Sequence, residues 1–198
     1  MKKPLIIGIT GGIGGGKSTL AKKLRMEGFD VFDSDLEARK LQNEHPVIKK
    51  ELIQLFGVEI YNSDRLNRKK LAGIVFNDKN LLQKLNAIVH PIVRNELSNW
   101  IEKRKNHKFL FVESAILFEN GMNALVDRVI VMTASEETRI RRVLKRDEIS
   151  VDQVKARMAN QLPEELKISR ADYVIHSDDS KPLVDKMRKI LLKLEEEM

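Results

Sequence analysis

Residues 8–19 read GITGGIGGGKST and contain six of the chain's ten glycines. They follow the apolar run of residues 4–10 and precede a stretch with leucines at helical spacing. Residues 11–18 match the pattern G-x-x-x-x-G-K-[ST], in which backbone amides and a lysine surround phosphate groups. Because a strand before the pattern and a helix after it are the context that this loop requires, we predict a phosphate-binding loop.

Each residue type in the loop has a physical role. Glycine permits positive φ and has no Cβ, so successive N–H groups can converge on phosphate oxygens, and the following helix start adds its positive dipole end. Lys17 is expected to reach the terminal phosphates, and Ser18 to bind Mg²⁺. The residues of this loop predicted to bind ATP are Gly12, Gly14, Gly15, Gly16, Lys17, Ser18 and Thr19.

Strand and helix signals alternate beyond the loop. Strand-like apolar runs follow at 29–33, 108–114, 127–133 and 171–177. Such alternation predicts an α/β fold with a parallel sheet covered by helices on both faces. Residues 46–106 are expected to be helical with no strand, and Pro91 to stand at the first position of a helix.

Composition limits the class of protein. The chain has 198 residues, 42% of them apolar, which predicts one domain with a substantial core. The absence of cysteine excludes disulfides, zinc fingers and thiol nucleophiles. The N-terminal apolar run is too short for a secretory signal, and no stretch approaches the roughly 18 apolar residues of a membrane span. We therefore expect a cytoplasmic protein without a membrane partner.

The formal net charge of +7 has two interpretations. One is binding of nucleic acid through its phosphates, and the other is a small enzyme whose ligands carry phosphates. Aromatic residues make up only 5% of the chain and offer little surface for stacking bases. This favours the enzyme, with a nucleotide-dependent nucleic-acid-binding protein as the alternative from another class.

The remaining motifs indicate the class of phosphate-loop protein. Regulatory GTPases carry N-K-x-D and D-x-x-G motifs, which this sequence lacks, and motor ATPases are usually longer. A small kinase fits the length, the helical stretch and the basic helices that follow. In such kinases the helical insertion holds the acceptor and the late helices form a lid.

The stretch FDSDLEARK contains the predicted acceptor side. Asp33 ends a strand, so its carboxylate is expected to face the phosphates and to orient a hydroxyl, a task for which a weak base suffices. Asp35 and Arg39 follow four residues apart, which also suits an ordinary helical ion pair. Ser34 and Glu37 have the spacing of a capping box.

The basic stretch RIRRVLKR is the predicted lid helix. It places five positive charges in eight residues, with Arg139, Arg142 and Arg146 on one stripe. An arginine brought onto a transferring phosphoryl group accelerates transfer strongly. The alternative is a solvated basic face.

Five stretches in order resemble the dephospho-CoA kinase family from about residue 5 to residue 180. They are GITGGIGGGKST, DSDLEAR, LNAIVHPIV, AILFE and RADYVIHSD. The resemblance implies phosphorylation of the ribose 3′-hydroxyl of dephospho-CoA by ATP with Mg²⁺, giving coenzyme A and ADP. The other candidate enzyme is a small kinase acting on a nucleoside, a nucleoside monophosphate or a sugar.

The resemblance also implies an architecture. It predicts a three-layer fold on a five-stranded parallel sheet, as one domain over 1–198 and as a monomer or small homo-oligomer. The parts are a core (1–35, 107–135 and 170–198), a helical acceptor-binding region (36–106) and a helical lid (136–169).

The resemblance also implies site residues, at the positions of this sequence that match the family's motifs. Asp33 matches the family's proposed base, and Arg142 and Arg146 match lid arginines that approach the phosphates. Glu113 stands where the family often has aspartate, and is expected to bind substrate or to hold Mg²⁺, directly or through water. Lys17, Asp33 and Arg142 are the predicted catalytic residues. Asp33, Asp35, Arg39, His90 and Glu113 are the predicted substrate contacts, and Arg157 and Gln161 match a lid pattern.

Overall fold

The computed structural model describes residues 3–75, 78–178 and 181–197. The chain forms two compact units. The sheet unit comprises Met1–Phe32 and Arg104–Met198, and the helical unit comprises Asp33–Lys103. The helical unit is therefore one continuous segment inserted between the two segments of the sheet unit.

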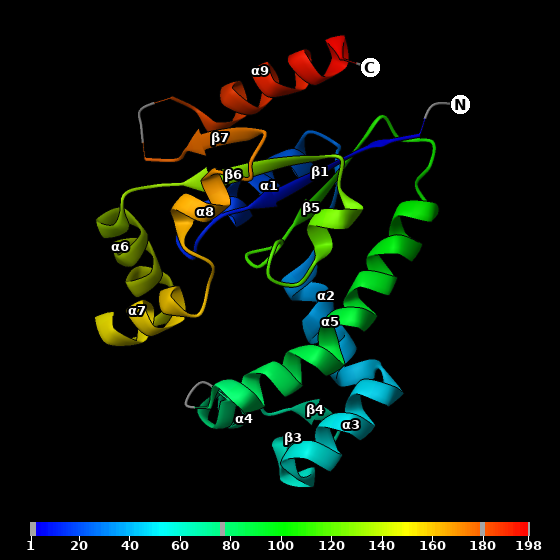
Figure 1. Cartoon of the computed structure of the whole chain (residues 1–198), viewed down its shortest axis with the longest axis vertical. Helices are drawn as coiled ribbons and strands as arrows, with labels where there is room; N and C mark the ends of the chain where they lie inside the picture. Colours follow the sequence, from blue (N-terminus) through cyan, green and yellow to red (C-terminus); the bar gives the residue numbers. More distant parts are fainter. Residues whose placement is uncertain (1–2, 76–77, 179–180, 198) are drawn as a thin grey trace. The chain divides into compact units, whose positions relative to one another are not determined.

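The sheet has five strands in the order β2-β5-β1-β6-β7 (Figure 1). β1 is parallel to β5 and β6, and β6 is parallel to β7, with Ile9 of β1 opposite Glu113 and Ile130. This confirms the α/β fold on a five-stranded parallel sheet. The strands are β1 (Leu5–Thr10), β2 (Asp30–Asp33), β5 (Phe109–Glu113), β6 (Arg128–Thr133) and β7 (Tyr173–His176).

Alternate residues of these strands build the two faces of the sheet. Ile7, Phe111 and Met132 share a buried cluster with Leu20 of α1 and Leu191 of α9, so these two helices cover one face. On the other face, a Cβ at Gly8 would lie 2.7 Å from Leu117, so the segment after β5 covers it closely. The helices of the sheet unit are α1 (Lys17–Met26), α6 (Glu136–Asp147), α7 (Val151–Ala159), α8 (Glu164–Ile168) and α9 (Leu183–Glu196).

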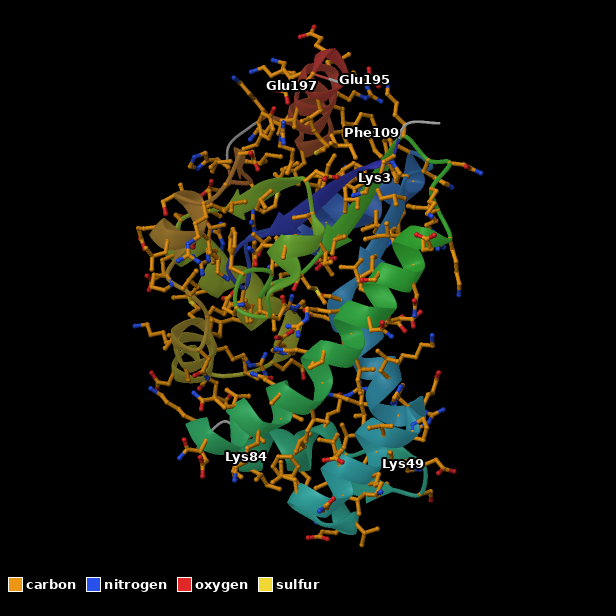
Figure 2. All side chains as sticks on the ribbon, turned by 45° about the vertical axis from the view of Figure 1, so that its right-hand side comes forward. Lys3, Lys49, Lys84, Phe109, Glu195 and Glu197 are labelled. Carbon is orange, nitrogen blue, oxygen red and sulfur yellow. The ribbon has the colours of Figure 1, made fainter. Side chains whose placement is uncertain are left out.

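Helix α9 also has ion pairs at its C-terminal end. Lys108 Nζ lies 2.6 Å from Glu195, and an Arg128 nitrogen lies 3.1 Å from Glu197; Figure 2 labels both glutamates. Exposed pairs of this kind contribute at most about 1 kcal/mol each. The buried apolar stripe, which includes Met187 and Leu194, is therefore the main stabilising contact of this helix.

The helical unit packs around one long helix, α5. Its buried residues Leu85, Val89, Val93 and Leu97 recur every four positions, and α5 contacts α2, α3 and α4. The elements of this unit are α2 (Ser34–Glu44), α3 (Pro46–Phe56), a 3₁₀ turn (Val58–Ile60), β3 (Tyr61–Asn62), β4 (Arg65–Leu66), α4 (Arg68–Val75) and α5 (Lys79–Glu102).

Two expectations for residues 46–106 are wrong. Residues 46–106 do contain strands, because β3 and β4 form a short antiparallel hairpin whose turn holds Ser63 at φ 54°. Pro91 lies inside α5 rather than at a helix start. The helix loses the hydrogen bond that Pro91 cannot donate, but the apolar stripe continues on both sides of it and keeps the helix intact.

No helix among residues 3–75, 78–178 and 181–197 combines the length and the apolar character needed to span a bilayer.

Candidate active site

The loop between β1 and α1 has the backbone that its glycines predict. Gly14 and Gly16 have φ of 80° and 94°, in the left-handed region that favours glycine. A Cβ at Gly14 would lie 2.5 Å from the carbonyl oxygen of Arg139, so no larger residue fits without a shift. Gly16 caps α1 without any side-chain hydrogen bond. The first N–H groups of α1 are therefore not capped by a side chain and suit an anionic ligand.

Lys17 lies with its ammonium group against the loop. Its Nζ donates to the carbonyl oxygens of Gly11 (2.9 Å) and Gly12 (3.1 Å), and the residue is 7% exposed. The positive charge is thus held beside the backbone that would surround a phosphate. Thr19 follows in the first turn of α1, where its N–H contacts the carbonyl of Gly16 at 3.1 Å.

Ser18 and Glu113 meet although they are 95 residues apart. The Ser18 hydroxyl donates to Glu113 Oε1 at 2.9 Å. Glu113 is the last residue of β5, next to β1, and is 7% exposed. Register explains the meeting, because Glu113 is opposite Ile9 on the face that α1 covers.

This pair has the chemistry of a magnesium site. Within the described parts of the chain, no group of three or more His, Asp or Glu side chains is placed to hold a metal ion. Mg²⁺ does not need such a group, because it is usually held by one or two side chains together with water and substrate phosphates. A hydroxyl and a carboxylate beside a phosphate-binding loop fit that description.

Arg142 is one of two lid arginines that contact the loop. Its Nη1 donates to the Gly14 carbonyl (3.2 Å) and to the Ser177 hydroxyl (2.7 Å), and its Nη2 donates to the Ser177 carbonyl (2.9 Å). Ser177 follows β7 and was not predicted as a site residue. Its signal in the sequence was its place in RADYVIHSD, one of the five stretches that resemble the family.

Arg146, by contrast, pairs with its neighbour on the chain. Its Nε donates to Asp147 at 2.6 Å, and its side chain is 59% exposed. Arg157 contacts the same carboxylate at 2.8 Å. Arg146 and Arg157 together keep the pKa of Asp147 below its usual value.

Arg139 is buried and contacts the loop through its side chain. Its Nε donates to the Ile13 carbonyl at 3.1 Å, and its guanidinium forms an ion pair with Glu164. Glu164 also accepts a hydrogen bond from the Thr133 hydroxyl at the end of β6. Burial lowers the pKa of Arg139, and the negative charges of Glu136 and Glu165 act in the opposite direction.

The segment 161–167 attaches the end of the predicted lid to the phosphate-binding loop and to the segment after β5. Gln161 Oε1 accepts from the Ile13 N–H at 2.9 Å, so Gln161 and Arg139 hold the two polar groups of Ile13. Lys167 is fully buried and donates to the Ala115 carbonyl at 2.7 Å and to Glu119 at 2.9 Å. Glu119 also accepts from the Leu162 N–H at 2.8 Å.

Sequence reasoning missed most of this segment. Lys167 and Glu164 belong to a charged stretch that resembles a solvated surface, and only burial distinguishes them. Glu119 had a weak signal as part of AILFE. Gln161 had one as part of the lid pattern.

Four of the five predicted substrate contacts lie in the helical unit, namely Asp33, Asp35, Arg39 and His90. Asp33 Oδ1 accepts from the Leu36 N–H at 2.9 Å and caps α2. The expected capping box that begins at Ser34 is therefore wrong, because Ser34 is already the first helical residue. Asp35 follows in the first turn of α2, and the Arg39 carbonyl accepts from Arg68 at 2.8 Å.

His90 lies halfway along α5. Burial lowers its pKa, and the positive charge of Arg94 lowers it further. The side chain is therefore held in a setting that favours the neutral imidazole.

The family model and the curated relatives identify the same family. The family model for dephospho-CoA kinase matches residues 5–182. A dephospho-CoA kinase of Bacteroides fragilis is 36% identical over 185 residues, which cover 93% of this chain and 90% of that protein.

Two solved structures have the same fold. A Thermus thermophilus protein is 38% identical, with a TM-score of 0.82 and 98% of each chain covered. A dephospho-CoA kinase from Campylobacter jejuni is 27% identical, with a TM-score of 0.66 and 96% of each chain covered.

Proposed function

Because this chain belongs to the dephospho-CoA kinase family and phosphorylates dephospho-CoA with ATP, we propose that the loop from Gly11 to Thr19 carries the reaction. The single observation that supports this assignment is the contact of Ser18 with Glu113, on the loop whose carbonyls hold the Lys17 ammonium. The loop thus carries a hydroxyl paired with a carboxylate, and a cation held by its own carbonyls.

In the proposed mechanism, the γ-phosphoryl group moves from ATP to the ribose 3′-oxygen of dephospho-CoA. The new bond joins that oxygen to phosphorus, and the bond to the β–γ bridging oxygen breaks, so that ADP leaves. Negative charge spreads over the phosphoryl oxygens in this loose transition state. Lys17 and Arg142 stabilise that charge, and the support for Arg142 is its contact with the Gly14 carbonyl.

Asp33 orients the attacking 3′-hydroxyl and receives its proton. The proton is lost late when the transition state is loose, so a carboxylate of ordinary basicity is sufficient. The support for this role is its position at the end of β2, where the helix cap limits the movement of the carboxylate.

Ser18 and Glu113, the latter directly or through a water, would hold Mg²⁺ with the β- and γ-phosphates. When bound there, the ion would supply positive charge that neutralises the phosphates. The contact between the two side chains supports this pairing.

The remaining assignments concern whole regions. We assign acceptor binding to the helical region 36–106, through Asp35, Arg39 and His90, and lid closure to 136–169, with Arg146 approaching the phosphates when the lid closes. We also expect a cytoplasmic enzyme, a monomer or small homo-oligomer, with no nucleic-acid or membrane partner.

The test is a coupled assay of ADP release. Purified protein with Mg-ATP should turn over dephospho-CoA faster than a nucleoside, a nucleoside monophosphate or a sugar. Turnover of a nucleoside monophosphate as fast as, or faster than, that of dephospho-CoA would reject the acceptor assignment. ATP hydrolysis that is stimulated by oligonucleotides would instead favour the nucleic-acid-binding alternative.

A further inference from the structure

Arg139, near the start of α6, lies against three consecutive residues of the phosphate-binding loop. Its Nε donates to the Ile13 carbonyl at 3.1 Å. A Cβ at Gly12 would collide with the Arg139 guanidinium, and a Cβ at Gly14 would collide with the Arg139 main chain. Arg139 therefore occupies the space beside the loop on both sides of Ile13.

The position of the Arg139 guanidinium is fixed by a carboxylate. Glu164, the first residue of α8, forms an ion pair with it, and the two side chains are only 9% (Arg139) and 14% (Glu164) exposed. Glu164 also accepts a hydrogen bond from the hydroxyl of the buried Thr133, the last residue of β6. An arginine side chain has many rotamers, so without such a partner its tip could leave the loop. The carboxylate, itself bonded to the sheet, holds the tip in place.

Stability alone does not explain this ion pair. Taking two charges out of water costs free energy that their mutual attraction often fails to recover, and apolar side chains of the same volume usually stabilise a fold at least as well. Apolar side chains could join α6 to the sheet, but they could not donate a hydrogen bond to the Ile13 carbonyl. What the pair provides beyond packing is therefore a fixed donor to the loop.

We propose that Arg139 is a positioning residue of the ATP site and that Glu164 and Thr133 hold it in place. In this role Arg139 does not touch the substrate. It keeps residues 12–14 in the conformation that receives the phosphates, so that ATP binds a loop that is already ordered. This inference rests on the proposed assignment of ATP binding to the loop, and it adds what holds that loop.

The first test compares the wild type with R139M. Methionine keeps an unbranched side chain but has no donor for the Ile13 carbonyl. The KM for ATP should rise by about 10-fold or more, and calorimetry should show the same rise in the Kd of Mg-ADP. The KM for dephospho-CoA and kcat should stay within about 2-fold of the wild type, because a loop that must be ordered on binding lowers affinity without slowing the bound complex.

The double variant R139M/E164Q separates positioning from stability. R139M alone leaves the Glu164 carboxylate buried without its arginine partner, which destabilises the fold. The double variant removes both charges of the pair, so its unfolding midpoint should recover relative to R139M. Its KM for ATP should nevertheless remain as high as in R139M, because the donor to Ile13 is still missing. The double variant tests the proposal even where R139M fails to fold.

E119Q is the matched control from the neighbouring ion pair. Glu119 pairs with the buried Lys167, three residues after Glu164, and glutamine removes the charge while it can still accept from the Leu162 N–H. This pair is bonded to the Leu162 N–H and the Ala115 carbonyl, which lie outside the loop. E119Q should therefore lower the unfolding midpoint and leave the KM for ATP unchanged.

The possible failures can be told apart. Wild-type protein that binds neither Mg-ATP nor Mg-ADP would overturn the proposed function of the loop itself. A wild type that binds Mg-ADP, together with an R139M/E164Q variant whose KM for ATP is that of the wild type, would overturn only the positioning role. An equal rise of the KM for ATP in E119Q and in the double variant would also overturn it, because the effect would then follow from lost stability and not from the contact with Ile13.

Discussion

Asp33 combines a structural contact with a proposed chemical role. Its carboxylate caps α2 through the Leu36 N–H, so removing the side chain would disturb both. Asparagine is as good an N-cap as aspartate but is a far weaker base. Asp33→Asn should therefore leave the fold and ATP binding nearly unchanged and lower kcat by about 100-fold or more.

Calorimetry with Mg-ATP and an unfolding curve are the controls for this variant. Asp33→Ala should lose about 1 kcal/mol of stability as well as turnover, because it removes the cap. Full turnover in Asp33→Asn would remove Asp33 from the mechanism.

Substitution of Gln161 tests whether its hydrogen bond to Ile13 holds the phosphate-binding loop in the conformation that binds ATP. Gln161→Ala leaves the Ile13 N–H without its side-chain acceptor, and a hydrogen bond of this kind contributes about 0.5–1.5 kcal/mol. If this contact holds the loop ready for phosphates, the KM for ATP should rise about 2- to 12-fold. The KM for dephospho-CoA should stay constant.

Gln153→Ala is the matched control for Gln161→Ala. Gln153 belongs to the capping box of α7, which the structure confirms, and is not bound to the loop. It should lower stability slightly without changing the KM for ATP. The same KM in Gln161→Ala and the wild type would mean that the contact does not shape the loop.

At the scale of elements, α5 carries a titratable group in its middle. The pKa of His90 is lowered by burial and Arg94, so the unfolded chain binds a proton more readily than the folded one. The contribution of His90 to the unfolding free energy is then fully present above the unfolded-state pKa of about 6.5. It is lost as pH falls from that value through the lower pKa of the folded state. The slope from this group cannot exceed about 1.4 kcal/mol per pH unit.

His90→Gln removes this titration. Urea unfolding between pH 8 and pH 5 should show a flatter decline of the unfolding free energy in the variant than in the wild type. Between pH 7.5 and 8 the two slopes should agree, which serves as the internal control. Equal slopes near pH 6 would show that His90 does not contribute to the pH dependence.

At the scale of the whole molecule, binding of a nucleotide should stabilise the fold. Mg-ADP at 100 times its Kd should add about 2.7 kcal/mol to the unfolding free energy. For a chain of this size, that corresponds to a rise in Tm of roughly 5–10 °C. Lys17→Ala should lose most of the rise, because the ammonium beside the loop carbonyls is gone.

Lys49→Ala controls for the loss of a lysine. Lys49 pairs with Asp64, and both residues belong to the helical unit, not to the unit that contains the loop. It should keep the full rise in Tm, and chelation of Mg²⁺ should reduce that rise in the wild type. A wild-type Tm that does not respond to Mg-ATP or Mg-ADP would contradict the phosphate-binding assignment.

Local patterns predicted much of the fold and of the loop. Lys17, Ser18 and the glycines stand next to each other, and each strand of the five-stranded sheet lies in one of the strand-like runs, so local pattern identified them. Pro91 shows the limit of such patterns. A proline usually starts or ends a helix, and only the packing of α5 on its neighbours keeps this helix continuous.

By itself, then, the sequence determined the phosphate-binding loop, the α/β alternation and the family, because these depend on residues adjacent along the chain. Only the tertiary structure decided that Glu113 meets Ser18, that Gln161 holds Ile13 from 148 residues away, and that Lys167 is buried. The physical reason is that partners and burial depend on strand order and register. Parallel strands bring distant residues to one edge of the sheet, and the charge pattern of the sequence does not record which of them lose contact with water.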